Sequence, residues 1–136
     1  MIFFTDECVP TNAARMLSYF EQEHEVRAHE EHFDKGTPDT VWMQVLATWN
    51  ETTIVISGDG RILKNKAEKR VLKECGLMFV CLAPGWTHTA WRDYGWKIIK
   101  VWPDIVRNIV DARYPMVFEV MVGSLKVRPM GRISDL

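Results

Sequence analysis

Short apolar runs alternate with amphipathic segments along the first 82 residues of the chain. The apolar runs have the length and the β-branched and aromatic content of buried strands, whereas the segments between them carry apolar residues at helical spacing. Such alternation is typical of an α/β domain with a mainly parallel sheet. The predicted strands cover residues 2–5, 25–28, 53–57 and 77–82, and the predicted helices cover residues 11–23, 38–50 and 66–75.

The pattern changes in the remainder of the chain. Residues 83–95 begin with Ala-Pro-Gly and predict a loop region. Residues 103–113 place their apolar side chains on one face, which predicts a helix. Residues 116–122 and 125–128 predict two strands around the two-residue turn Gly123-Ser124, so we expect a terminal β-hairpin.

Size and charge indicate one domain without a strong overall field. The chain has 136 residues, of which 47% are hydrophobic, and this is enough to bury one core. We expect a single domain over residues 1–136, with a core at 1–115 and a hairpin extension at 116–130. Because 17 basic and 18 acidic residues give a net charge of -1, binding to nucleic acid must come from a local patch.

The sequence lacks the signals of secretion, membrane insertion and disulfide bonding. No apolar run approaches the roughly 20 residues that cross a bilayer, and the amino terminus lacks a signal-peptide pattern. We therefore expect a cytoplasmic protein that makes no membrane contact. Cys8, Cys75 and Cys81 are odd in number and form no CxxC pair, which argues against a disulfide framework or a zinc knuckle. We expect buried free thiols instead.

Two aspartates directly follow predicted strands. Asp6 comes after the strand at 2–5, and Asp59 stands between two glycines after the strand at 53–57. Ligands of open α/β sheets bind beyond the carboxyl ends of the strands, so both side chains are candidates to face one pocket. The alternative is a pair of ordinary turn aspartates, whose side chains bond to nearby backbone.

A third aspartate, Asp39, stands at a predicted helix start, with Thr37 as the cap and Pro38 at the first helical position. The helix dipole alone also favours a carboxylate there. All three aspartates can lie at one edge of the sheet, where carboxylate oxygens suit a hard cation, so Asp6, Asp39 and Asp59 predict a site for Mg²⁺ or Mn²⁺. Because crowded carboxylates repel, we expect Asp59→Asn to abolish metal binding and to leave the fold intact or more stable.

A second candidate metal site lies at His29 and His32, with two glutamates between them and Asp34 just after. If this segment were helical, the cluster would suit a transition metal. The segment lacks a neighbouring cysteine and the HExxH pattern, and it precedes Gly36-Thr37-Pro38. A solvated loop is therefore the simpler interpretation.

Basic residues crowd into the stretch that begins two residues after Asp59, interrupted only by Glu68. They are Arg61, Lys64, Lys66, Lys69, Arg70 and Lys73. Beside a metal site, such a stretch can grip a phosphate backbone, and Arg61, Lys64 and Lys66 are the candidate RNA-binding residues. The alternative is a solvated helix face.

The order of these motifs resembles that of PIN-domain proteins over about residues 1–82. Asp6-Glu7 follows the first strand, Asp39 opens a helix, and Ser57-Gly58-Asp59 follows a later strand. The likeness is closest to compact PIN-like proteins whose first strand ends in an Asp-Glu pair, a group that includes the VapC toxins of toxin–antitoxin pairs. It implies a three-layer α/β/α fold and a metal-dependent ribonuclease in which the aspartates hold Mg²⁺ or Mn²⁺.

The resemblance also implies an RNA substrate and a cognate antitoxin, and it allows a homodimer. Ser57 matches the small hydroxyl residue that the family places ahead of its last aspartate. One departure concerns Arg61, because many PIN nucleases carry a further acidic residue two positions after that aspartate. Glu7 is then the candidate for the fourth carboxylate, although adjacent side chains at a strand end can point apart.

Two other function classes stay open. A phosphoacceptor receiver domain also places acids after its first strand and an aspartate after a central strand. It needs a hydroxyl residue where Ala83-Pro84-Gly85 stands, however, and it gives Asp39 no role. A non-catalytic PIN-like binding module follows from the missing carboxylate at Arg61. The function predicted first is a metal-dependent endoribonuclease, the toxin of a type II toxin–antitoxin pair.

Overall fold

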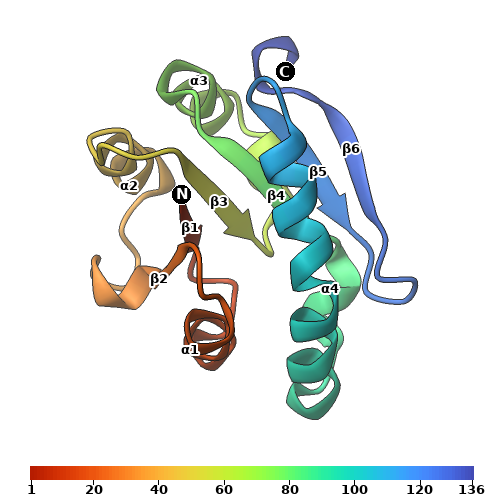
Figure 1. The fold of residues 1–136 in the computed structure, drawn as a ribbon. Coiled ribbons are helices and arrows are strands. Elements are labelled where there is room, and N and C mark those ends of the chain that lie inside the picture. Colours follow the sequence, from red (N-terminus) through yellow and green to blue (C-terminus); the bar gives the residue numbers. More distant parts are fainter.

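Six strands form one twisted sheet in the order β2-β1-β3-β4-β5-β6 in the computed structural model, which describes residues 1–136 (Figure 1). Strands β1 to β5 are parallel to their neighbours, and β6 runs antiparallel to β5. The strands are β1 (Ile2–Thr5), β2 (Glu25–Ala28), β3 (Thr53–Ser57), β4 (Met78–Leu82), β5 (Met116–Val120) and β6 (Val127–Arg132). This arrangement confirms the predicted α/β fold.

Four α-helices cover the two faces of the sheet. They are α1 (Thr11–Phe20), α2 (Asp39–Leu46), α3 (Lys66–Cys75) and α4 (Trp91–Asp111). Figure 1 shows α1 and α4 on one face and α2 and α3 on the other, which gives the three-layer α/β/α architecture. The chain also forms four short 3₁₀-helices, of which the last follows β6: η1 (His29–Glu31), η2 (Gly60–Leu63), η3 (Pro84–His88) and η4 (Ile133–Asp135). None of the helices combines the length and the apolar composition that crossing a membrane requires.

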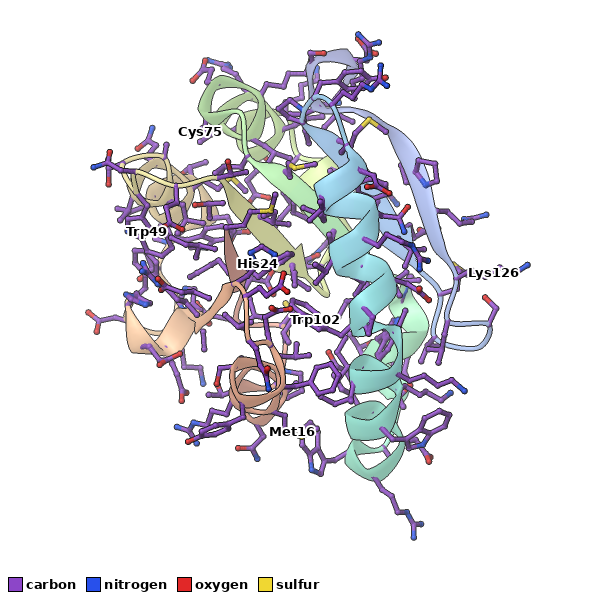
Figure 2. All side chains as sticks on the ribbon, viewed as in Figure 1. Met16, His24, Trp49, Cys75, Trp102 and Lys126 are labelled. Carbon is purple, nitrogen blue, oxygen red and sulfur yellow. The ribbon has the colours of Figure 1, made fainter.

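The alternation of side chains along each strand divides the core into two layers. Phe3 of β1 packs with the α1 and α4 layer, and its ring lies 4.8 Å from that of Trp102 between centroids. Phe4 points to the opposite face and packs against Trp42 of α2. Strands β1, β3 and β4 are buried on both faces, which explains why they appear as unbroken apolar runs in the sequence. Side chains fill both spaces between the sheet and its helices (Figure 2).

The predicted helix at residues 103–113 is confirmed as far as Asp111, but it begins earlier than predicted, and the prediction of a loop over residues 83–95 is wrong. Residues 84–88 form η3, and α4 runs without a break from Trp91 through Pro103 to Asp111. Trp86 is buried in η3, and its indole Nε1 donates to the carbonyl of Val120 at 3.0 Å. Packing of an apolar stripe that spans the whole helix outweighs the local effect of the proline.

Two other helices end earlier than predicted. Helix α1 ends at Phe20 rather than at residue 23, because the Glu21 carboxylate accepts the backbone N–H groups of Glu23 and His24 at 2.8 and 3.1 Å and turns the chain toward β2. Helix α2 ends at Leu46 rather than at residue 50, and Trp49 folds back against Phe4 with ring centroids 6.1 Å apart. A local contact of side chain with backbone therefore ends α1, and a tertiary contact accompanies the end of α2.

The terminal hairpin is confirmed, but its connection is longer than predicted. Val120 pairs with Val127, so residues 121–126 form the loop in place of a two-residue turn. Leu125 in this loop has a φ of 54°. Strand β6 is an edge strand and carries Pro129 opposite Phe118, as expected of a strand with an unpaired side.

The expectation of three buried free thiols is wrong for two of them. Cys81 is buried, Cys75 is partly exposed at the end of α3 and Cys8 is exposed, and all three are free.

Candidate functional site

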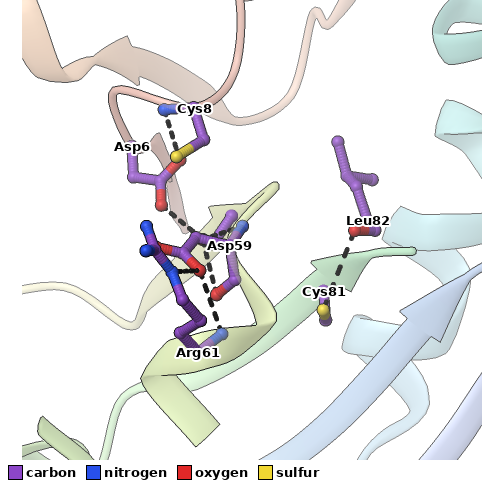
Figure 3. Close-up of polar contacts among 7 residues, drawn as sticks. Asp6, Cys8, Asp59, Arg61, Cys81 and Leu82 are labelled. Carbon is purple, nitrogen blue, oxygen red and sulfur yellow. Dashed lines mark hydrogen bonds and ion pairs between the residues drawn. The ribbon is translucent and has the colours of Figure 1, made fainter. Parts of the chain in front are cut away.

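Asp6 occupies a buried position at the carboxyl end of β1. Its backbone N–H donates to the carbonyl of Ile56 at 3.0 Å and so continues the pairing of β1 with β3. The side chain is only 5% exposed. Its Oδ1 accepts the backbone N–H of Cys8 at 3.0 Å, and its Oδ2 accepts the hydroxyl of Ser57 (Figure 3). Burial raises the pKa of Asp6 to about 7 despite these hydrogen bonds.

Ser57, the last residue of β3, joins two of the predicted site residues. Its hydroxyl is fully buried and donates to the Asp6 carboxylate, while the same oxygen accepts the backbone N–H of Asp59 at 2.9 Å. The side chain therefore fixes the loop after β3 against the end of β1. A serine fits here because a hydroxyl both donates and accepts in a space too small for a longer side chain.

Asp59 is held by Arg61 in the loop after β3. Arg61 Nε lies 2.9 Å from Oδ1, and a terminal guanidinium nitrogen lies 2.9 Å from Oδ2 (Figure 3). Hydrogen bonding from Arg61 lowers the pKa of Asp59. At Asp59 this attraction outweighs the repulsion from other carboxylates, and the expected effect of Asp59→Asn on metal binding and on the fold stays a prediction.

Asp39 is the first residue of α2 and is half-buried. Its Oδ1 accepts the indole Nε1 of Trp42 at 2.9 Å. Burial raises the pKa of Asp39, and the charges of Asp59 and Glu7 raise it further. The predicted role of Thr37 as helix cap is wrong, because Pro38 precedes the helix and the Thr37 hydroxyl donates to the Asp34 carbonyl at 2.7 Å.

The three aspartates share one edge of the sheet and influence one another. The charge of Asp39 raises the pKa of Asp6, and the charge of Asp59 raises that of Asp39. Glu68 in the first turn of α3 belongs to the same group, because burial and the charges of Asp39 and Asp59 raise its pKa. From the sequence, Glu68 is only an interruption of the basic stretch. Its place in the first turn of a helix that follows Asp59 was the available signal.

Glu7 makes its polar contacts outside this group, although its charge contributes to the raised pKa of Asp39. Its Oε1 accepts the backbone N–H of Gly36 at 2.9 Å and lies 3.2 Å from Nε2 of His29. His29 is 3% exposed, so the interpretation of this segment as a solvated loop is wrong for that residue. His32 is exposed and packs on Trp49, with ring centroids 5.3 Å apart. The two histidines therefore do not form a joint metal site.

The basic residues begin beside the acidic edge. Arg61 is paired with Asp59, whereas Lys64 and Lys66 are exposed at the start of α3. Asn65 caps this helix, and its Oδ1 accepts the backbone N–H groups of Ala67 and Glu68 at 3.0 Å each. The cap fixes where α3 begins and so places Lys64, Lys66 and Glu68 close to the loop after β3.

The donor set at this edge has the chemistry of a hard divalent cation site. Carboxylate oxygens of Asp6, Asp39 and Asp59 come from three different loops, and repulsion between them is the condition that a bound cation relieves. As the side chains stand, no three His, Cys, Asp or Glu groups are close enough together to hold a metal. The Arg61 pair holds both oxygens of Asp59, so a cation would have to displace the guanidinium.

Comparison with known proteins gives one match. A family model described as a PIN-like domain matches residues 1–84, the part of the chain that contains β1 to β4 and all of the acidic edge. No curated protein and no solved structure matches the chain.

Proposed function

This chain belongs to the PIN-like domain family, and from that premise we propose that it is a metal-dependent endoribonuclease that hydrolyses RNA phosphodiester bonds. The single observation that carries the proposal is the convergence of Asp6, Asp39 and Asp59 at one sheet edge, with the pKa of buried Asp6 raised to about 7. Strong perturbation of a carboxyl pKa beside other acids is characteristic of functional sites. The family match favours this function over the receiver alternative.

The three aspartates would hold Mg²⁺ or Mn²⁺. When bound, such a cation offsets the charge that develops on the attacked phosphate and favours deprotonation of the attacking water. Glu68 is the better candidate for a fourth carboxylate than Glu7, because the charges of both Asp39 and Asp59 act on Glu68, whereas the Glu7 carboxylate accepts the backbone N–H of Gly36 and lies 3.2 Å from His29. The carboxylate missing at Arg61 is then supplied from the next helix.

Side chains of the protein would position the metal ligands and the RNA strand. Ser57 keeps the Asp6 carboxylate at the end of β1 by its hydrogen bond, and the Cys8 backbone N–H fixes the other carboxylate oxygen. Lys64 and Lys66 provide exposed positive charge beside the acidic edge, where they would bind phosphates of the RNA strand. The carboxylates would therefore act at the scissile phosphate, and the two lysines would bind the neighbouring phosphates.

The finer role that we propose is that of a toxin, restrained by a cognate antitoxin. The family resemblance supports this role. Its test is expression in a bacterial host: the wild type should arrest growth, and Asp6→Asn should not. Equal growth of both strains at equal protein levels would contradict a toxin role and leave the nuclease assignment unaffected.

A second candidate function is that of a PIN-like binding module without turnover. The Asp59–Arg61 pair favours it, because a guanidinium occupies the carboxylate that the cation needs. Such a module would bind RNA through Lys64 and Lys66 and would leave it intact.

The deciding experiment is incubation of total cellular RNA with purified protein and Mn²⁺ or Mg²⁺, in parallel with EDTA and with Asp6→Asn and Asp39→Asn. Circular dichroism should first show that all variants are folded. Cleavage that needs both the metal and the aspartates supports the nuclease. RNA binding by folded wild-type protein without cleavage would instead identify the binding module. Asp104→Asn on α4, outside the acidic group, is the matched control and should cleave like the wild type.

A further inference from the structure

A cavity of about 290 Å³ lies beside Asp6, on the side of β1 that faces β2. It extends from the end of β1 to η1 and the start of α1, and it does not include Asp39, Asp59 or the basic stretch. The residues that matter for its chemistry are Thr5, Asp6, Glu7, Thr11, His29 and Lys35. The acidic edge and this cavity thus share Asp6 and Glu7 and are otherwise separate.

Two buried polar atoms that lie on residues of this cavity have no hydrogen-bond partner. Thr5 is 1% exposed and its Oγ1 is unpaired. His29 is 3% exposed, and although its Nε2 lies 3.2 Å from Glu7 Oε1, the arrangement does not make a hydrogen bond. Buried polar atoms are nearly always paired in folded proteins, so two unpaired ones beside the same cavity point to a ligand.

The charges around the cavity identify the kind of ligand. Asp6, Glu7 and Glu30 contribute carboxylates, and Lys35 is the cation among the lining residues. This balance disfavours a phosphate and favours an uncharged group that hydrogen-bonds. The Thr5 hydroxyl donates and accepts, and a neutral histidine nitrogen can do either, so the two unpaired atoms suit a group that carries donors and acceptors side by side.

We propose that this cavity binds the nucleoside part, base and ribose, of the nucleotide next to the scissile phosphate. The assignment rests on the proposed nuclease function, because that function brings an RNA strand to Asp6. Unstacked bases and ribose hydroxyls of single-stranded RNA offer the donors and acceptors that Thr5 and His29 lack.

The test uses Thr5→Val, which removes the unpaired hydroxyl and keeps the shape of the side chain. Binding of adenosine, cytidine and uridine is measured by NMR titration in EDTA, so that neither metal nor cleavage contributes. We expect at least one nucleoside to bind the wild type and Thr5→Val to weaken it about tenfold, the effect of one buried hydrogen bond. The same substitution should raise the thermal midpoint of the free protein, because an unsatisfied buried hydroxyl is removed.

Weaker nucleoside binding together with a higher thermal midpoint distinguishes a ligand contact of Thr5 from a structural role, which would lower the midpoint. Thr53→Val is the matched control: Thr53 is buried at the other end of the sheet, and its hydroxyl donates to the Glu51 carbonyl at 3.0 Å. It should lower the midpoint and leave nucleoside binding unchanged. His29→Phe is the second variant, since His29 already packs among Phe4 and Phe33; it should also weaken binding.

Three results would overturn the proposal. They are no nucleoside binding by the wild type, equal binding by wild type and Thr5→Val, and competition for the cavity by inorganic phosphate. None of them depends on cleavage. If the protein binds nucleosides and does not cut RNA, the cavity assignment holds and the nuclease function fails. If it is a metal-dependent nuclease that binds no nucleoside, the nuclease function holds and the cavity assignment fails.

Discussion

Asp59 and Arg61 form a two-point ion pair, in which guanidinium nitrogens lie 2.9 Å from each carboxylate oxygen. Asp59 is mostly buried, with 18% of its side chain exposed, whereas the Arg61 side chain is 85% exposed. The arginine therefore binds the aspartate from the solvent side and is free to leave. At the proposed metal site, position 61 would thus hold a competitor for the cation in place of a ligand for it.

Removing this competitor should strengthen metal binding. We expect Arg61→Ala to tighten the binding of Mn²⁺ about fivefold, because the cation no longer has to displace the guanidinium from the Asp59 carboxylate. Arg61→Glu should tighten it further by adding a carboxylate. Isothermal titration calorimetry measures both affinities.

Lys64→Ala is the control for this prediction, since it removes one exposed positive charge at the end of the same 3₁₀ turn without touching Asp59. It should change the Mn²⁺ affinity less than twofold by long-range charge alone. Equal gains from Arg61→Ala and Lys64→Ala would show that overall charge, and not release of Asp59, governs metal affinity.

Asp6 makes the stability of the metal-free protein depend on pH. Its pKa is about 7 in the folded protein against an ordinary value of 3.8, so between these values the folded protein keeps a proton that the unfolded chain has released. The stabilising contribution is complete below pH 3.8 and is lost as pH rises through 7. In EDTA, we expect the free energy of unfolding to fall by roughly 2–4 kcal/mol over this window.

Asp6→Asn should remove most of this dependence and raise stability at pH 8 by about 1–3 kcal/mol, because the buried position no longer carries a charge. Urea unfolding at several pH values gives the measurement. Asp111→Asn, at the exposed end of α4, should keep the wild-type slope. A wild-type stability that is flat between pH 4 and 7 would contradict the raised pKa of Asp6.

Local sequence patterns were sufficient to predict the backbone of the acidic edge. Fully buried parallel strands are unbroken apolar runs, and the residues that follow them must lie at one edge, so Asp6 and Asp59 were found from the sequence. The register of Thr5 beside Ile56 then brings Asp6 next to Ser57. Glu68 and His29 could not be placed in this way, because their positions depend on how α3 and η1 pack against the sheet.

Long helix α4 escaped prediction for a related reason. Its buried residues Tyr94, Ile98, Trp102, Ile105 and Ile109 keep one face along the whole helix, but tryptophans, a glycine and Pro103 interrupt the apolar pattern on the way. A proline is a common helix start, so local signals divided one helix into a loop and a shorter helix. The packing of α4 against α1 and β1, including the contact of Trp102 with Phe3, joins the two parts.

Lys64 and Lys66 should contribute to RNA binding through phosphate contacts. We expect the double substitution Lys64→Ala and Lys66→Ala to weaken binding of a single-stranded RNA to the protein in EDTA, and to reduce the slope of log K against log salt by about 1.4, roughly 0.7 for each lost phosphate contact. Fluorescence anisotropy over a series of salt concentrations measures this slope. The control is the pair Lys69, which is partly exposed, and Lys73, which is exposed; both lie farther along α3 and should change the slope less. An unchanged slope in the Lys64 and Lys66 variant would assign these residues to a solvated helix face.

Pro103→Ala distinguishes one long helix from a helix that begins at residue 103. Pro103 is exposed inside α4, where it lacks the N–H that would bond to the carbonyl of Ile99, so we expect the substitution to stabilise the protein by about 1–3 kcal/mol. At a helix start the same proline would be favourable, and its removal would be neutral or destabilising. Urea unfolding monitored by circular dichroism gives the sign, with Lys100→Ala on the same exposed side as a control that should change stability by less than about 0.5 kcal/mol. A loss of stability in Pro103→Ala would contradict the continuous helix, because only an interior proline leaves a carbonyl of the preceding turn without its donor.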